Sequence, residues 1–126
     1  MSEPSRLEKG TAVIQKLFGS AAARVTMPPD FRRITVENLF GDVWSRPGLA
    51  LEERSMITLA ALIVLGREAE LRIHFRGARN LGIARAKIEE ILIHLAHYGG
   101  WPVAASGFRV LDEVFAAMDA EAKTAG

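Results

Sequence analysis

Hydrophobic residues recur along this chain at the three- and four-residue spacing of amphipathic helices, and no segment shows the alternation expected of a strand. The pattern predicts an all-α fold of about six helices. Ser5 and Glu8 form a capping-box signature, which marks the start of the first helix. Gly19 is suited to end that helix. Its apolar face is made by Val13, Ile14, Leu17 and Phe18.

Two prolines within residues 25–29 predict a linker, and a second helix is expected to start near Asp30. A turn at residues 46–48 then separates it from a third helix, predicted over residues 51–65. The third helix begins with acidic residues, which complement the helix dipole, and then becomes apolar nearly all round. The loose apolar stripe of the second helix consists of Phe31, Ile34, Leu39, Val43 and Trp44.

The third helix predicts a homo-oligomer. A helix that is apolar on every side is expected at the centre of a fold or of an assembly. One chain of 126 residues has little other material with which to cover such a helix, so copies of the chain are expected to cover it instead.

Three more helices are predicted in the second half of the chain. The fourth covers residues 68–80, with Gly82 as its C-terminal cap. The fifth covers residues 85–98 and is broken by the two glycines that follow. The sixth starts near Pro102, a residue suited to a first turn, and fades out in the polar tail of residues 121–126. The length fits a single domain over residues 1–126.

Composition narrows the classes of function. The net charge is +1, and 16 basic residues are interleaved with 15 acidic ones, so no basic block suggests nucleic-acid binding. The chain has no cysteine, which excludes disulfides, thiolate catalysis and Fe–S clusters. The first nine residues lack the pattern of a signal peptide, and the longest apolar run is too short to span a bilayer. We therefore expect a cytoplasmic protein that has no membrane partner.

The fourth helix carries the most suggestive chemistry. Arg67, Glu70 and His74 are spaced so that they share one helical face. One interpretation is an acid/base histidine oriented by Glu70, with Arg67 anchoring an anionic substrate through paired hydrogen bonds. The alternative is a polar cluster that only joins helices, and spacing alone slightly favours it. A different face of this helix carries three arginines, which we expect to face solvent or an interface. They are Arg72, Arg76 and Arg79.

Weaker signals lie on the fifth helix and beside the loops. His94 and His97, together with Glu90, have a spacing that can bind metal, but a pocket or interface role for His94 is the preferred interpretation, and no metal site is predicted. The three residues Trp44, Tyr98 and Trp101 could line an aromatic pocket, although such residues are more often core or interface anchors. Two glycines between Tyr98 and Trp101 would allow a ligand to approach the backbone.

Four segments together resemble the carboxymuconolactone decarboxylase family, most strongly over residues 44–115. They are WSRPGL at 44–49, ERSMITLAALIVLGRE at 53–68, ELRIHFRGARNLGI at 70–83 and IEEILIHLAHYGGWPVA at 88–104. The resemblance implies an alkyl hydroperoxidase D-like helical domain that assembles as a trimer or hexamer. It also implies a carbon–carbon lyase that needs no cofactor and decarboxylates a carboxymuconolactone in the β-ketoadipate pathway of aromatic-acid breakdown.

A related peroxidase branch of this superfamily carries the motif CxxCxxxH. By that resemblance His74 matches the histidine, Arg67 and Glu70 stand at the two cysteine positions, and Ser55 stands where that branch has a glutamate. Thiol peroxidase chemistry is therefore not expected. Arg109 stands where the decarboxylase often has histidine.

The leading hypothesis is a decarboxylase of a small anionic substrate. His74 and Glu70 are its candidate catalytic residues, and the candidate substrate-binding residues are Arg67, His94, Trp44, Tyr98 and Trp101. The alternative is a non-catalytic small-molecule-binding or scaffold protein of the same fold.

Overall fold

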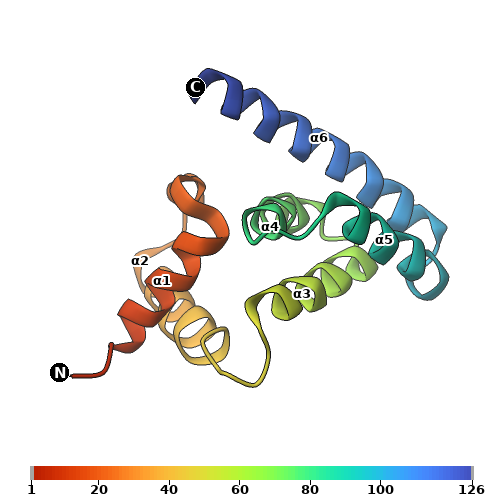
Figure 1. The fold of residues 1–126 in the computed structure, drawn as a ribbon. Helices are drawn as coiled ribbons and strands as arrows, with labels where there is room; N and C mark the ends of the chain where they lie inside the picture. The colour runs from red at the N-terminus through yellow and green to blue at the C-terminus, as the bar shows by residue number, and fades with distance from the viewer. Residues whose placement is uncertain (1, 126) are drawn as a thin grey trace. The chain divides into compact units, whose positions relative to one another are not determined.

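The computed structural model describes residues 2–125, and every regular element within this range is helical, as the hydrophobic pattern predicts. Six α-helices are joined by one 3₁₀ segment and one π-helical segment (Figure 1). Contacts divide the chain into two compact units, one up to Arg54 and one from Ser55 onwards, which are described separately below. The elements are α1 (Arg6–Phe18), η1 (Gly19–Arg24), α2 (Pro29–Ile34), η2 (Thr35–Val43), α3 (Leu51–Leu65), α4 (Glu68–Asn80), α5 (Arg85–Gly99) and α6 (Trp101–Ala125).

The first helix starts and stops where its sequence signals predict. The Ser5 side chain accepts a hydrogen bond from the backbone N–H of Glu8, and the Glu8 carboxylate accepts one from the backbone N–H of Ser5. This capping box satisfies two N–H groups that a helix start leaves without partners. Gly19 ends α1 with a positive φ of 53°, a conformation that favours glycine.

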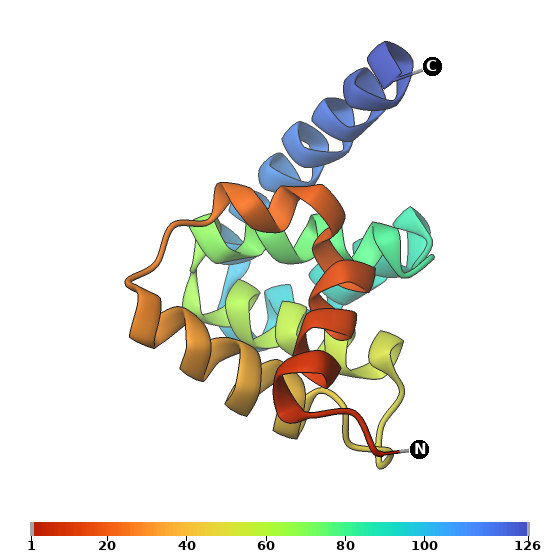
Figure 2. The ribbon, with the colours of Figure 1, turned by 90° about the vertical axis from the view of Figure 1, so that its left-hand side faces the viewer.

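Two glycines let α1 and η2 pack backbone against backbone (Figure 2). A Cβ placed on Gly10 of α1 would lie only 2.0 Å from the carbonyl oxygen of Val36 in η2. Reciprocally, a Cβ placed on Gly41 of η2 would lie 2.4 Å from the carbonyl oxygen of Arg6. Larger residues at these two positions would therefore force the two helices apart.

The loose apolar stripe expected for the second helix is mostly exposed in the isolated chain. Phe31, Ile34, Leu39 and Val43 are exposed, and only Trp44 is buried, together with Phe40. Leu39 and Val43 lie in the π-helix of residues 35–43, whose hydrogen bonds span five residues, so an α-helical period does not describe that segment. Phe31 and Ile34 precede it, in α2.

Helices α3 to α6 form the second unit around one hydrophobic core. The long helix α6 contacts both α4 and α5 (Figure 1). Gly82 follows α4 with φ of 87°, and Gly100 follows α5 with φ of 107°, so both sharp turns use glycine. The core is made by Leu59, Ile63, Leu71, Phe75, Ala78, Ile83, Ile88, Leu92, Val110, Leu111, Val114 and Phe115.

The other helices of the chain do not bury α3 on all sides. Only Ser55, Leu59 and Ile63 are fully buried, whereas Ile57 and Leu65 are exposed. This exposure agrees with the expectation that one chain has too little material to cover the helix alone. Burial in an assembly of several chains stays a prediction.

The arginine stripe of α4 faces α6 rather than bulk solvent. Arg72 pairs with Glu113, Arg76 with Glu121 at 2.6 Å, and Arg79 with Asp119 at 2.6 Å. The guanidinium of Arg79 also lies 4.9 Å from the centre of the Phe115 ring. The structure also corrects the expectation for the end of the chain. The polar tail remains helical to Ala125 instead of fading out near residue 121.

Candidate functional site

The N-terminal end of α4 holds the residues that the sequence singled out first. Arg67 occupies the N-cap position of the helix without a side-chain capping bond, and its Nη2 donates a hydrogen bond of 2.6 Å to Oε1 of Glu70. Both side chains are largely exposed. The Arg67 guanidinium lowers the pKa of the Glu70 carboxyl, so the carboxylate form is favoured. His74 lies one turn further along the same side of the helix and is only partly exposed.

The pKa of His74 is lowered from 6.5 to about 4, chiefly because burial disfavours the charged ring. The negative charge of Glu70 acts in the opposite direction and is the weaker influence. At neutral pH the ring is therefore neutral, and only about one molecule in a thousand carries the extra proton. A neutral imidazole still has one N–H to donate and one nitrogen that accepts.

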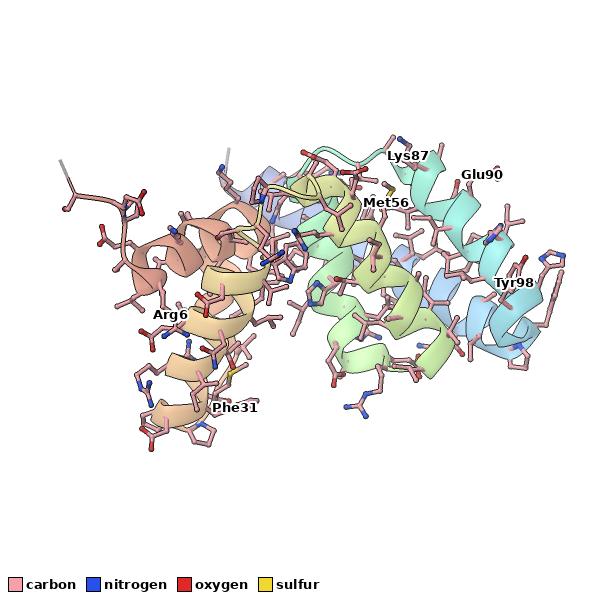
Figure 3. The ribbon with its side chains drawn as sticks, turned by 90° about the horizontal axis from the view of Figure 1, so that it is seen from below. Arg6, Phe31, Met56, Lys87, Glu90 and Tyr98 are labelled. Carbon is pink, nitrogen blue, oxygen red and sulfur yellow. The ribbon has the colours of Figure 1, made fainter. Side chains whose placement is uncertain are left out.

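An aromatic cluster lies at the junction of α5 and α6. The rings of His94 and Tyr98 stack with their centres 5.1 Å apart, and His97 meets Trp101 edge to face at 5.6 Å. Tyr98 and Trp101 are 76% and 68% exposed, so both rings face outwards in the isolated chain. Figure 3 shows Tyr98 at the edge of the second unit, on α5.

The Arg67–Glu70 pair and the aromatic cluster lie at the same end of the second unit. A Cβ placed on Gly66, in the turn before α4, would lie 3.9 Å from Val103, and one placed on Gly99, at the end of α5, would lie 3.1 Å from the same residue. The turn before α4, which carries Arg67, therefore lies near the C-terminal end of α5, which carries Tyr98. Whether His74, His94 and the aromatic residues line one pocket stays a prediction.

Trp44 and Arg109 are each held by other contacts. Trp44 is 6% exposed, and its ring packs against Phe40 with the centres 5.8 Å apart within the first unit. It is a core residue of that unit, and its predicted substrate contact stays a prediction. Arg109 forms ion pairs with Glu68 and Glu113, so it helps to join α4 and α6.

Ser55 is a residue whose environment the sequence did not reveal. It is fully buried, and its hydroxyl has no hydrogen-bond partner among the described residues. A buried hydroxyl without a partner is costly, which sets this position apart from the apolar residues beside it. The only sequence signal was its alignment with the glutamate of the peroxidase branch.

Residues 2–125 contain neither a metal-binding cluster nor a membrane-spanning helix. No group of three or more His, Cys, Asp or Glu side chains in that range is arranged to hold a metal ion. None of the helices described there is long and apolar enough to cross a membrane.

The fold and the α4 cluster define a small helical protein with an arginine, a carboxylate and a half-buried imidazole on one helix. Residues 29–113 match the carboxymuconolactone decarboxylase family, and the chain belongs to that family. It is 32% identical over 121 residues to 4-carboxymuconolactone decarboxylase of Acinetobacter baylyi, covering 91% of this chain and 90% of that protein. This finding confirms the resemblance drawn from the four sequence segments.

A second relative has a different named activity. The chain is 40% identical over 73 residues to the nitrosuccinic acid decarboxylase npaB of Metarhizium robertsii. That match covers 56% of this chain and 50% of the fungal protein. Two relatives named as decarboxylases of different acids support a decarboxylase-like function at the level of the family.

Proposed function

We propose that this protein is a cofactor-independent decarboxylase of a small dicarboxylic acid, and that Arg67, Glu70 and His74 carry the reaction. The observation that carries the proposal is the placement of a guanidinium, a carboxylate and an imidazole along one side of α4 in a member of this family. A small carboxylated lactone of aromatic-acid breakdown is the first substrate to test.

The chemistry of the two named acids supports a dicarboxylate. Carboxymuconolactone and nitrosuccinic acid each carry two carboxyl groups. In each, one carboxyl group sits on a carbon whose carbanion can be delocalised, into an unsaturated lactone or into a nitro group. The second carboxylate is not lost and can serve as an anchor.

Arg67 is suited to hold that anchor. Its guanidinium is exposed at the end of α4 and now pairs with Glu70, an exposed neighbour, in a kind of ion pair that contributes little stability. A substrate carboxylate can replace Glu70 and accept two parallel hydrogen bonds from the arginine. Glu70 is then released beside His74, where its negative charge favours the protonated ring.

His74 then has two tasks in the proposed reaction. The bond between the carboxylate and its carbon breaks, CO2 leaves, and the electron pair spreads onto an oxygen of the lactone or nitro group. The ring N–H donates a hydrogen bond to that oxygen. The substrate's charges and Glu70 raise the pKa of the ring from its low value, so that His74 can deliver a proton to the carbanion.

The test is release of CO2 from 4-carboxymuconolactone and from nitrosuccinate, measured for three variants. We expect His74→Gln and Arg67→Gln each to lower turnover about a hundredfold or more, the usual share of acid–base catalysis. Arg72→Gln is the matched control, because Arg72 lies on the same helix but pairs with Glu113. It should keep near-normal turnover.

The outcomes separate the enzyme from the alternative. Near-normal turnover by His74→Gln would refute its acid role, and loss of folding in that variant would favour the purely structural interpretation of the cluster. Tight binding of a dicarboxylate with no release of CO2 by the unaltered protein would favour the non-catalytic binding protein.

A further inference from the structure

The outer side of α5 is exposed along its whole length and mixes apolar with charged residues. A surface helix normally presents a polar face to solvent. Here Ile93 is 49% exposed and Tyr98 is 76% exposed. Figure 3 shows Lys87, Glu90 and Tyr98 spaced along this helix at the edge of the second unit. The residues of this outer face are Ala86, Lys87, Glu90, Ile93, His94, His97 and Tyr98.

The order of residues on this face makes it complementary to itself. Glu90 and His97 are about two helical turns apart, so they lie on the same stripe, with Ile93 and His94 midway between them. If a second copy of α5 runs antiparallel about a two-fold axis at this midpoint, Glu90 comes opposite the partner's His97. The same pair forms a second time by symmetry, and Ile93 comes opposite the partner's His94.

The ring of His97 is already oriented for such a contact. Its Nδ1 lies 3.0 Å from the carbonyl oxygen of Ile93 on the same helix. Because a carbonyl can only accept, Nδ1 carries the hydrogen, and Nε2 is left for another group. A carboxylate placed against Nε2 favours the doubly protonated, cationic ring, which gives a charge-assisted hydrogen bond.

We propose that the outer face of α5 is a two-fold contact with a second copy of this chain, in which antiparallel helices pair Glu90 with the partner's His97. The proposal commits to an assembly with an even number of chains. Neither Glu90 nor His97, the two residues changed in the test, belongs to the proposed reaction, whereas His94 and Tyr98 of the same face are candidate substrate-binding residues.

A charge swap tests the contact, with the mass measured by light scattering and sedimentation at micromolar concentration. His97→Glu sets two carboxylates against each other, twice in each interface, and should halve the mass. Glu90→His should do the same, because it removes the carboxylate that pairs with the partner's His97. The dissociation constant should rise at least about tenfold in each single variant.

The double variant Glu90→His with His97→Glu restores the pairing with its direction reversed, so it should recover the mass of the unaltered protein. Lys123→Glu, a charge reversal on the exposed end of α6, is the control and should leave the mass unchanged. Circular dichroism and the melting temperature should show that all variants remain folded.

Three outcomes would overturn the proposal. The first is an unaltered protein that is monomeric or contains an odd number of chains. The second is a single variant that keeps the full mass. The third is a double variant that stays dissociated although it is folded, since an interface of this geometry must tolerate the swap.

Discussion

The low pKa of His74 makes the stability of the protein depend on pH in a defined window. The pKa of the ring is about 4 in the folded chain and 6.5 when it is free of the fold. Between these values the unfolded chain binds more protons than the folded one. The contribution of His74 to the free energy of unfolding is therefore fully present above about pH 6.5 and decreases as the pH is lowered. It is lost by about pH 4.

The size of the effect follows from the two pKa values. At pH 5 the unfolded chain is almost fully protonated at this ring, whereas the folded chain is mostly neutral. The difference lowers the free energy of unfolding by about 2 kcal/mol at pH 5 relative to pH 7. Carboxylates with lowered pKa, such as Glu70 and Glu113, act in a lower pH range and contribute little at pH 5.

The substitution His74→Gln isolates this contribution. Glutamine has a similar volume and hydrogen-bonding capacity but does not titrate. Urea unfolding at pH 7 and pH 5 should show the loss of about 2 kcal/mol in the unaltered protein and not in the variant. At pH 7 the two proteins should be almost equally stable.

A direct measurement accompanies the unfolding experiment. The ring proton signals of His74, followed by NMR during an acid titration, should move with a midpoint near pH 4. A midpoint close to 6.5, or the same pH dependence with and without the imidazole, would show that the ring is not removed from solvent.

Two further predictions concern chemistry and packing. The protein should show no thiol-dependent reduction of an alkyl hydroperoxide, because Arg67 and Glu70 stand at the cysteine positions of the peroxidase motif; reductant-coupled turnover above that of a boiled sample would contradict this. Gly10→Ala should lower the free energy of unfolding in urea by about 1–3 kcal/mol, since its Cβ would lie 2.0 Å from the Val36 carbonyl oxygen. Thr11→Ala, on the exposed side of the same helix, should cost less than about 0.5 kcal/mol. A Gly10→Ala variant that is as stable as the unaltered protein would show that α1 and η2 do not pack so closely.

Local signals were sufficient for the ends of most helices. The capping box at Ser5 and the glycines at positions 19, 82 and 100 act through hydrogen bonds and backbone angles of their immediate neighbours. Such features need no information from distant parts of the chain, and the structure confirms them. The spacing of Arg67, Glu70 and His74 along one side of α4 was also readable, because helical periodicity alone sets it.

Contacts between residues far apart in the sequence decided which side chains are paired, exposed or buried. The π-helical winding of residues 35–43, with Phe40 as its buried aromatic residue, was not predicted by the α-helical spacing. Acidic residues of α6, some forty positions away in sequence, pair with the arginines of α4, and α6 continues to Ala125. Similarly, burial lowers the pKa of His74, and burial depends on which other parts of the fold surround a residue. The sequence therefore determined which groups share α4, and the tertiary structure decided which of them are paired, exposed or neutral.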